Sequence, residues 1–208
     1  MNHSTGLAFR LAGMTPAEGS ASVLPEPAAP VDAAARRAFA AALGLPGDPA
    51  GPQWAPHLAA FQVATGGGEL DGEGAGSVVH RAVSGAAEAI VASAAEQHRA
   101  AARGLLVART LRSDPVVNGF DRRWDRGLFV SLIGVAVAAA DLLGLSRQGV
   151  ATAIELTAPV SLAVRSAGRP DALTVSLKVH AAVESALLAA AGVTSPSGVL
   201  EAALTTAG

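Results

Sequence analysis

Cysteine and tyrosine are absent from this sequence of 208 residues, and aromatic residues make up only 3% of it. Without cysteine the chain forms no disulfide scaffold, offers no thiolate nucleophile and holds no cysteine-ligated metal or iron–sulfur site. Charge is also scarce, because charged residues amount to 15% and leave a formal net charge of −2. With scattered arginines, no basic stripe and few aromatic stacking platforms, the chain is not expected to bind nucleic acid.

The sequence also lacks long apolar runs. Its amino terminus has neither the charged start nor the continuous apolar stretch of a secretory signal. The longest apolar run, Gly127 to Ala140, ends at Asp141 and is shorter than the roughly 20 residues that span a bilayer. We therefore interpret it as a buried core helix and expect a cytoplasmic protein without a membrane partner.

Small apolar residues, chiefly alanine, valine, leucine and glycine, are what the sequence has in abundance. Because small side chains let helices approach closely, we expect an all-α fold, a compact helical bundle. The length suits one domain. Residues 5–13 are compatible with a short helix, but prolines at 25, 27 and 30 indicate an irregular arm. We therefore divide the chain into an irregular N-terminal arm, 1–30, and a helical domain, 31–208.

Apolar periodicity and capping residues place the helices of this domain. Ser77 and Ser146 are expected to cap two of them, and residues 66–76 and 113–124 to form an acidic and a charged loop. The expected helices cover about 31–43, 57–65, 77–93, 96–111, 127–140, 150–162 and 173–191, with a last short helix ending near 204.

Three segments carry a resemblance to a known family. Residues 59–73 have the sequence A-A-F-Q-V-A-T-G-G-G-E-L-D-G-E and are followed by G-S-V-V-H at 76–80. Residues 127–145 form an apolar stretch ending in D-L-L-G-L, and residues 182–201 end in V-T-S-P and G-V-L-E. In this order they resemble the MmgE/PrpD family, which includes 2-methylcitrate dehydratase, cis-aconitate decarboxylase and iminodisuccinate epimerase. The resemblance implies that family's helical domain and a homodimer.

The resemblance also implies where a site would lie. The family's site contains an aspartate in an L-D-F-D-D loop, a histidine in a His-Pro pair, a histidine in F-H-x-T and a lysine. The first falls on Asp71, with Glu73 at the next acidic position. The His-Pro pair falls on Gly74 and Ala75, and the F-H-x-T histidine falls on Asp125.

The lysine is replaced as well. Alignment on the helix end at Gly192 moves the family's lysine to Asp171, so Lys178, the only lysine in the chain, does not match it. These replacements remove positive charge and add negative charge. A di- or tricarboxylate substrate would be repelled unless Arg123 and Arg126 compensate.

Several residues are candidates for chemistry, each with a plainer interpretation beside it. Asp71 and Glu73 suit a carboxylate pair with one member protonated, or else a solvated turn. Asp125, next to Trp124, suits either a catalytic carboxylate or a helix N-cap.

Lys178 and His180 are two residues apart on one helix and therefore point in different directions. His180 is either an active-site base or a buried, hydrogen-bonded histidine, and Lys178 contacts either substrate or solvent. His80 and His98 lie on different helices with nothing at ligand spacing, so we expect neither a metal site nor a cofactor.

These observations lead to three hypotheses. The first is a repurposed MmgE/PrpD-like enzyme that catalyses elimination, isomerisation or cyclisation of a largely apolar secondary-metabolite intermediate. Its catalytic groups would be Asp71, Glu73, Asp125 and His180, and its substrate contacts Arg123, Trp124, Arg126 and Lys178. The second is a non-catalytic dimerising or scaffold relative, and the third is a dehydratase or decarboxylase of a small carboxylate. A water-excluding cavity around Asp71 and either Asp125 or His180 would favour an enzyme.

Overall fold

The computed structural model describes residues 6–17, 32–42, 50–65, 75–121, 123–162 and 170–208. Over these ranges the chain is an all-α bundle without an extended strand, as the composition predicted. The helices are α1 (Leu7–Ala12), α2 (Ala33–Ala42), α3 (Ala55–Thr65), α4 (Ala75–Ala89), α5 (Ala94–Arg112), α6 (Pro115–Asn118), α7 (Arg126–Leu142), α8 (Arg147–Ser161), α9 (Ala172–Ala190) and α10 (Val199–Ala207).

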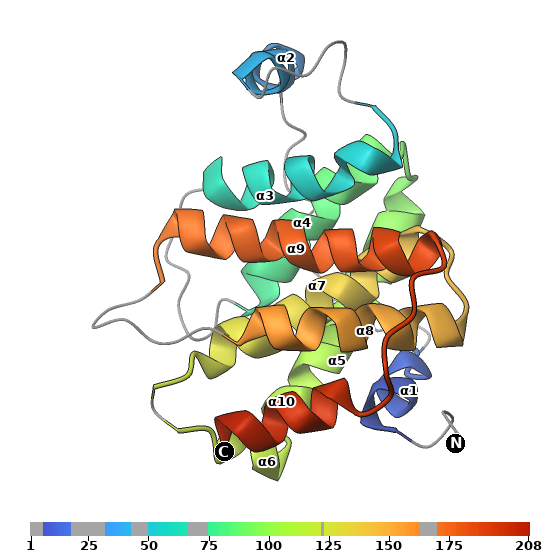
Figure 1. Ribbon diagram of the computed structural model, residues 1–208. Helices are drawn as coiled ribbons and strands as arrows, with labels where there is room; N and C mark the ends of the chain where they lie inside the picture. The colour runs from blue at the N-terminus through green and yellow to red at the C-terminus, as the bar shows by residue number, and fades with distance from the viewer. Residues whose placement is uncertain (1–5, 18–31, 43–49, 66–74, 122, 163–169) are drawn as a thin grey trace.

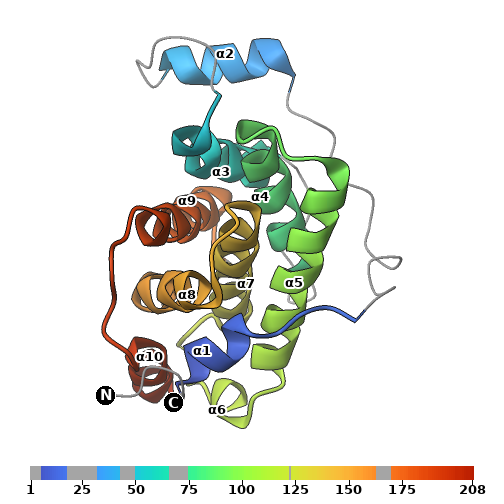
Figure 2. The same ribbon diagram turned by 90° about the vertical axis from the view of Figure 1, so that its right-hand side faces the viewer.

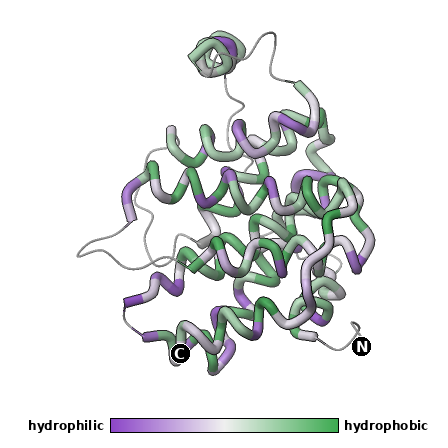
Figure 3. The backbone as a smooth tube through the Cα atoms, viewed as in Figure 1, coloured by the Kyte–Doolittle hydropathy of each residue, from purple (hydrophilic) through white to green (hydrophobic). Residues whose placement is uncertain are grey.

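The central helix is α7. Every residue from Leu128 to Ala140 is buried, which confirms the interpretation of this apolar run as a core helix. Figure 2 shows α7 between a layer formed by α8 and α9 on one side and α5 on the other. Figure 3 shows hydrophobic residues along α7, α8 and α9, with hydrophilic residues gathered toward helix ends.

Glycine contacts allow the helices to pack closely. A Cβ atom at Gly134 of α7 would lie 2.8 Å from the carbonyl oxygen of Gly104 in α5, and one at Gly104 would collide with the Gly134 carbonyl. A Cβ at Gly85 of α4 would meet the backbone of Leu58 in α3 in the same way. Backbones at this separation leave no room for a methyl group, which confirms the tight packing expected from small residues.

Local signals placed most helix boundaries correctly. Ser146 is the N-cap of α8, where its Oγ accepts a hydrogen bond from the Gly149 N–H at 3.3 Å. The prediction that Ser77 is an N-cap is wrong, because α4 begins at Ala75 and Ser77 is already helical. Within the expected charged loop, Asp114 caps the short helix α6.

The two end helices of the chain lie at the same end of the bundle (Figure 2). Helix α1, expected at 5–13, packs on α8 and buries Ala8, Leu11 and Ala12. The Leu7 N–H donates to Glu201 Oε1 of α10 at 2.7 Å. Part of the expected irregular arm is therefore a docked helix. Residues 18–31 lie outside the described ranges, so the division near residue 30 stays a prediction.

Helix α9 belongs to the face of the bundle that Figure 1 turns toward the viewer. It lies between α3 and α8 on this face, and it runs antiparallel to α8. Its N-cap is Asp171, whose Oδ1 accepts from the Thr174 N–H at 2.6 Å. Hydrogen bonds from these N–H groups lower the pKa of Asp171. Helix α9 therefore has one side in the core and the other on the surface.

Candidate functional site

The start of α7 contains the first group of predicted site residues. Asp125 is the N-cap of this helix, and its Oδ1 accepts a hydrogen bond from the Leu128 N–H at 2.8 Å. The N-cap interpretation of Asp125 is thus confirmed. Arg126 extends away from this cap and donates from Nη1 to Asn118 Oδ1 at 2.9 Å.

The neighbouring Arg123 and Trp124 also have local contacts. Arg123 Nε lies 3.3 Å from Asp121 Oδ2, and the Arg123 guanidinium lies 5.9 Å from the centre of the Trp124 ring. The indole N–H of Trp124 is buried without a hydrogen-bond partner. Both arginines proposed to bind a carboxylate substrate are therefore engaged by side chains of their own turn.

Lys178 closes the end of another helix. Its Nζ donates to the carbonyl oxygen of Leu162 at 3.1 Å and also to that of Val160, both at the C-terminus of α8. Burial lowers the pKa of Lys178. A cation at this place satisfies carbonyls that have no partner within the helix and interacts favourably with the helix dipole. Its structural role is thus visible, whereas a contact with substrate stays a prediction.

His180 has the most chemical potential of the described candidates. Its ring meets that of His57 in α3 edge to face, with ring centres 4.7 Å apart and planes at 89°. His180 Nδ1 lies 3.8 Å from Glu184 Oε2 one turn further along α9. Burial and the neighbouring His57 lower the pKa of His180, against an opposing effect of Glu184.

Sequence reasoning did not single out His57. Its Nδ1 is buried without a hydrogen-bond partner, and the ring of Trp54 stands edge to face against it at 5.7 Å. Nothing in the local sequence indicates that His57 and His180 meet, because packing of α3 on α9 brings them together.

The remaining predicted residues cannot be placed beside these. Asp71 and Glu73 lie outside the described residues, so the carboxylate pair stays a prediction. Asp125 and His180 make their contacts with different groups, one at the start of α7 and the other between α9 and α3. No group of three histidine, aspartate or glutamate side chains in the described ranges is arranged to hold a metal ion.

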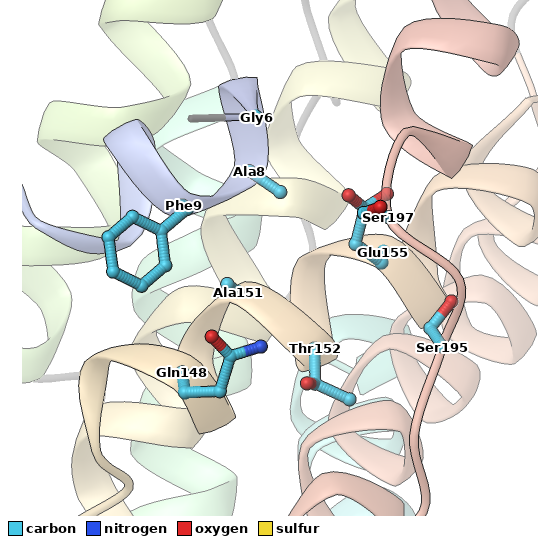
Figure 4. A pocket seen from close by; sticks show the side chains of 9 residues that line it. All are labelled: Gly6, Ala8, Phe9, Gln148, Ala151, Thr152, Glu155, Ser195 and Ser197. Atoms are coloured by element: carbon cyan, nitrogen blue, oxygen red, sulfur yellow. The ribbon is translucent and has the colours of Figure 1, made fainter. Parts of the chain in front are cut away.

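A small cleft lies elsewhere, between α1, α8 and the segment before α10 (Figure 4). Phe9, Gln148, Thr152, Ser195 and Ser197 are among its lining residues, and none of the predicted site residues is. Its free volume of about 20 Å³ holds about one water molecule and is far too small for a substrate.

Glu155, at the base of this cleft, connects α8 to α10. Its carboxylate accepts hydrogen bonds from the N–H groups of Gly198 at 3.1 Å and Leu200 at 2.6 Å. Burial raises the pKa of Glu155, while these hydrogen bonds act in the opposite direction. The residue is therefore an anchor for the N-terminus of α10, which has no side-chain cap of its own.

The surface of α9 carries an uncovered apolar stripe. Leu173, Leu177 and Leu188 are 69%, 63% and 41% exposed, and helical spacing places them on one side together with Ala181 and Glu184. We call these five residues the outer face of α9.

By length and composition, α9 is also the one helix of the described ranges that is apolar enough to cross a membrane. Core helices of soluble proteins meet the same criteria, and one side of α9 is packed in the bundle.

Comparisons of this chain with family models, with curated proteins and with solved structures found no match.

Proposed function

We propose that the protein is a non-catalytic assembly subunit, built on an MmgE/PrpD-like helical frame, that binds another protein surface through the outer face of α9. The observation that carries this proposal is the exposure of Leu173, Leu177 and Leu188 on one stripe. Single exposed apolar residues are ordinary, but a contiguous apolar stripe is typical of an interaction site. Covering these leucines would contribute roughly 3 kcal/mol per copy.

The contacts of the predicted site residues support the same proposal. Asp125 caps α7, Lys178 closes α8 and Arg126 holds Asn118. A substrate that recruited these groups would have to compete with hydrogen bonds that stabilise helix ends. Such residues serve the fold of a binding subunit without further change.

The test places a photo-activatable leucine analogue at position 177 in the cells that produce the protein. Irradiation should yield one discrete cross-linked product, because the outer face is covered in the native assembly. The same analogue at position 116 is the control, since Val116 is 49% exposed on α6, away from this face. A yield at 177 no greater than at 116 would contradict the proposal.

A second function, acid–base catalysis, is favoured by one observation, the contact between His57 and His180. A histidine whose pKa is lowered is neutral near pH 7 and can accept a proton from a substrate, and its neighbour can carry the proton onward. In this alternative the protein is a repurposed lyase or isomerase whose small-molecule substrate lies over the exposed leucines beside His180.

Metabolites of the producing cells distinguish the two functions. We would compare, by mass spectrometry, cells with the intact gene, without it, and with His57→Gln or His180→Gln. A precursor of the same mass as the lost product would indicate isomerisation or cyclisation, and one heavier by water or carbon dioxide a dehydratase or decarboxylase. Unchanged metabolites in all strains would favour the assembly subunit.

A further inference from the structure

The outer face of α9 is complementary to itself. Large side chains lie toward its two ends, Leu173 and Leu177 at one and Leu188 at the other, with Ala181 between them. A small residue at the middle lets two helices cross closely, while larger residues on either side fill the space where they diverge. Resting on the assembly function proposed above, we infer that the bound surface is a second copy of this chain, which docks antiparallel across α9 about a two-fold axis at Ala181.

The spacing along the helix fits this arrangement. Leu173 and Leu188 are nearly equidistant from Ala181 along a helix that rises about 1.5 Å per residue, so the stripe is about 22 Å long. The two-fold axis therefore places Leu173 against Leu188 of the second copy, and Leu188 against Leu173 of the second copy. Each leucine thus meets an apolar partner, as a self-complementary two-fold interface requires.

The charges favour the antiparallel direction. The axis brings Glu184 opposite Lys178 of the second copy, because the two residues are equally far from Ala181 on opposite sides. The Glu184 side chain is 54% exposed and has only His180, at 3.8 Å, beside it within its own chain. A parallel, in-register pair would instead place Glu184 against Glu184, which like charges disfavour.

Neighbouring helices extend the contact beyond α9. Figure 1 shows α3 and α8 flanking α9 on the same face, and Val160 at the end of α8 is itself exposed beside Lys178. A stable dimer buries about 800 Å² per copy, which one helix stripe alone does not supply. The second copy therefore also covers parts of α3 and α8 and shields the edge of the His57–His180 contact from water.

The absence of cysteine makes this geometry directly testable by engineered disulfides. Ala181→Cys should form a disulfide-linked dimer under mild oxidation, because the two Cys residues meet at the axis. An equimolar mixture of Leu173→Cys and Leu188→Cys should cross-link at least tenfold more than either variant alone. Val116→Cys on α6 is the control and should remain monomeric on a non-reducing gel. Efficient cross-linking of Leu188→Cys with itself, or Ala181→Cys at the level of the control, would overturn the antiparallel arrangement.

Light scattering separates failure of this inference from failure of the proposed function. The wild-type protein and Val116→Glu should be dimers, and Leu177→Glu should be a monomer with an unchanged circular dichroism spectrum. A wild-type monomer at all concentrations overturns the second copy as partner. If position 177 then still cross-links to a different protein in cells, the assembly function stands, and if it does not, both fail. Binding of that monomer to phosphatidylcholine vesicles, lost in Leu177→Glu, would assign the face to a membrane instead.

Discussion

Val91 shows how a single residue ends a helix against its own preference. It follows α4 with a φ of 57°, the only non-glycine residue of the described ranges with a positive φ, and its side chain is 84% exposed. The N–H of Ala92 donates to the Ala87 carbonyl at 2.9 Å, and that of Val91 to the Glu88 carbonyl at 3.3 Å. This is the Schellman geometry, in which glycine is the usual residue at the left-handed position.

Replacement of Val91 by glycine should therefore stabilise the protein. The left-handed conformation costs a residue with a Cβ atom roughly 1–2 kcal/mol, and the greater freedom of glycine in the unfolded chain offsets part of the gain. We expect Val91→Gly to raise the free energy of unfolding by about 1 kcal/mol in urea denaturation. Val116→Gly, the same change at an exposed helical valine, should lower it by about 0.5 kcal/mol. Equal effects of the two changes would show that Val91 is not strained.

At the scale of elements, the crossing of α5 and α7 depends on Gly104 and Gly134. A methyl group at Gly104 would collide with the Gly134 carbonyl and approach the Ala138 Cβ to 2.9 Å, so the helices would have to separate. We expect Gly104→Ala to cost about 2 kcal/mol, although alanine favours an exposed helix by about 1 kcal/mol. In Gly76→Ala the new Cβ meets Leu105 Cδ2 at an ordinary 3.8 Å, so thermal denaturation should show a change within about 0.5 kcal/mol.

The attachment of α10 depends on Glu155 of α8. In Glu155→Gln one acceptor oxygen becomes an NH₂ group that faces the N–H of Leu200 or Gly198, so one hydrogen bond is lost. We expect a cost of about 1–2 kcal/mol and faster amide hydrogen exchange in α10. Glu184→Gln, which removes a half-exposed carboxylate, is the control. Unchanged exchange in α10 would show that Glu155 does not anchor it.

At the scale of the whole molecule, buried histidines should make the stability depend on pH. Burial lowers the pKa of both His80 and His180 from the usual value of 6.5, so the unfolded chain takes up protons first as the pH falls. The free energy of unfolding should therefore decrease from pH 7.5 to pH 5.5 and be flat above. The raised pKa of Glu155 acts in the opposite direction as the pH falls further, because there the folded chain takes up its proton first.

A variant isolates the contribution of His180. In His180→Gln the urea midpoint should fall less between pH 7.5 and pH 5.5 than in the wild-type protein, since one depressed histidine is gone. His98→Gln, at a half-buried histidine on α5, is the comparison. A slope unchanged by His180→Gln would mean that contact with His57 does not oppose its protonation.

The sequence predicted most helices but only part of the candidate site. The end of α4 was placed near Ser93, four residues late, because nothing in Ile90-Val91-Ala92 resembles a helix stop. The capping role of Asp125 was one of two interpretations and is visible locally. The partner of His180 was not predictable, since His57 belongs to a helix far away in the chain.

Local interactions explain what the sequence determined by itself. Apolar residues at helical spacing and capping side chains such as Ser146 and Asp125 act within one or two turns, so the helices and the all-α class follow from the sequence alone. Only the tertiary structure decided that Glu155 holds α10, that His57 meets His180 and that α9 keeps Leu177 on the surface. These contacts join elements distant in the chain, and the packing of whole helix faces selects them.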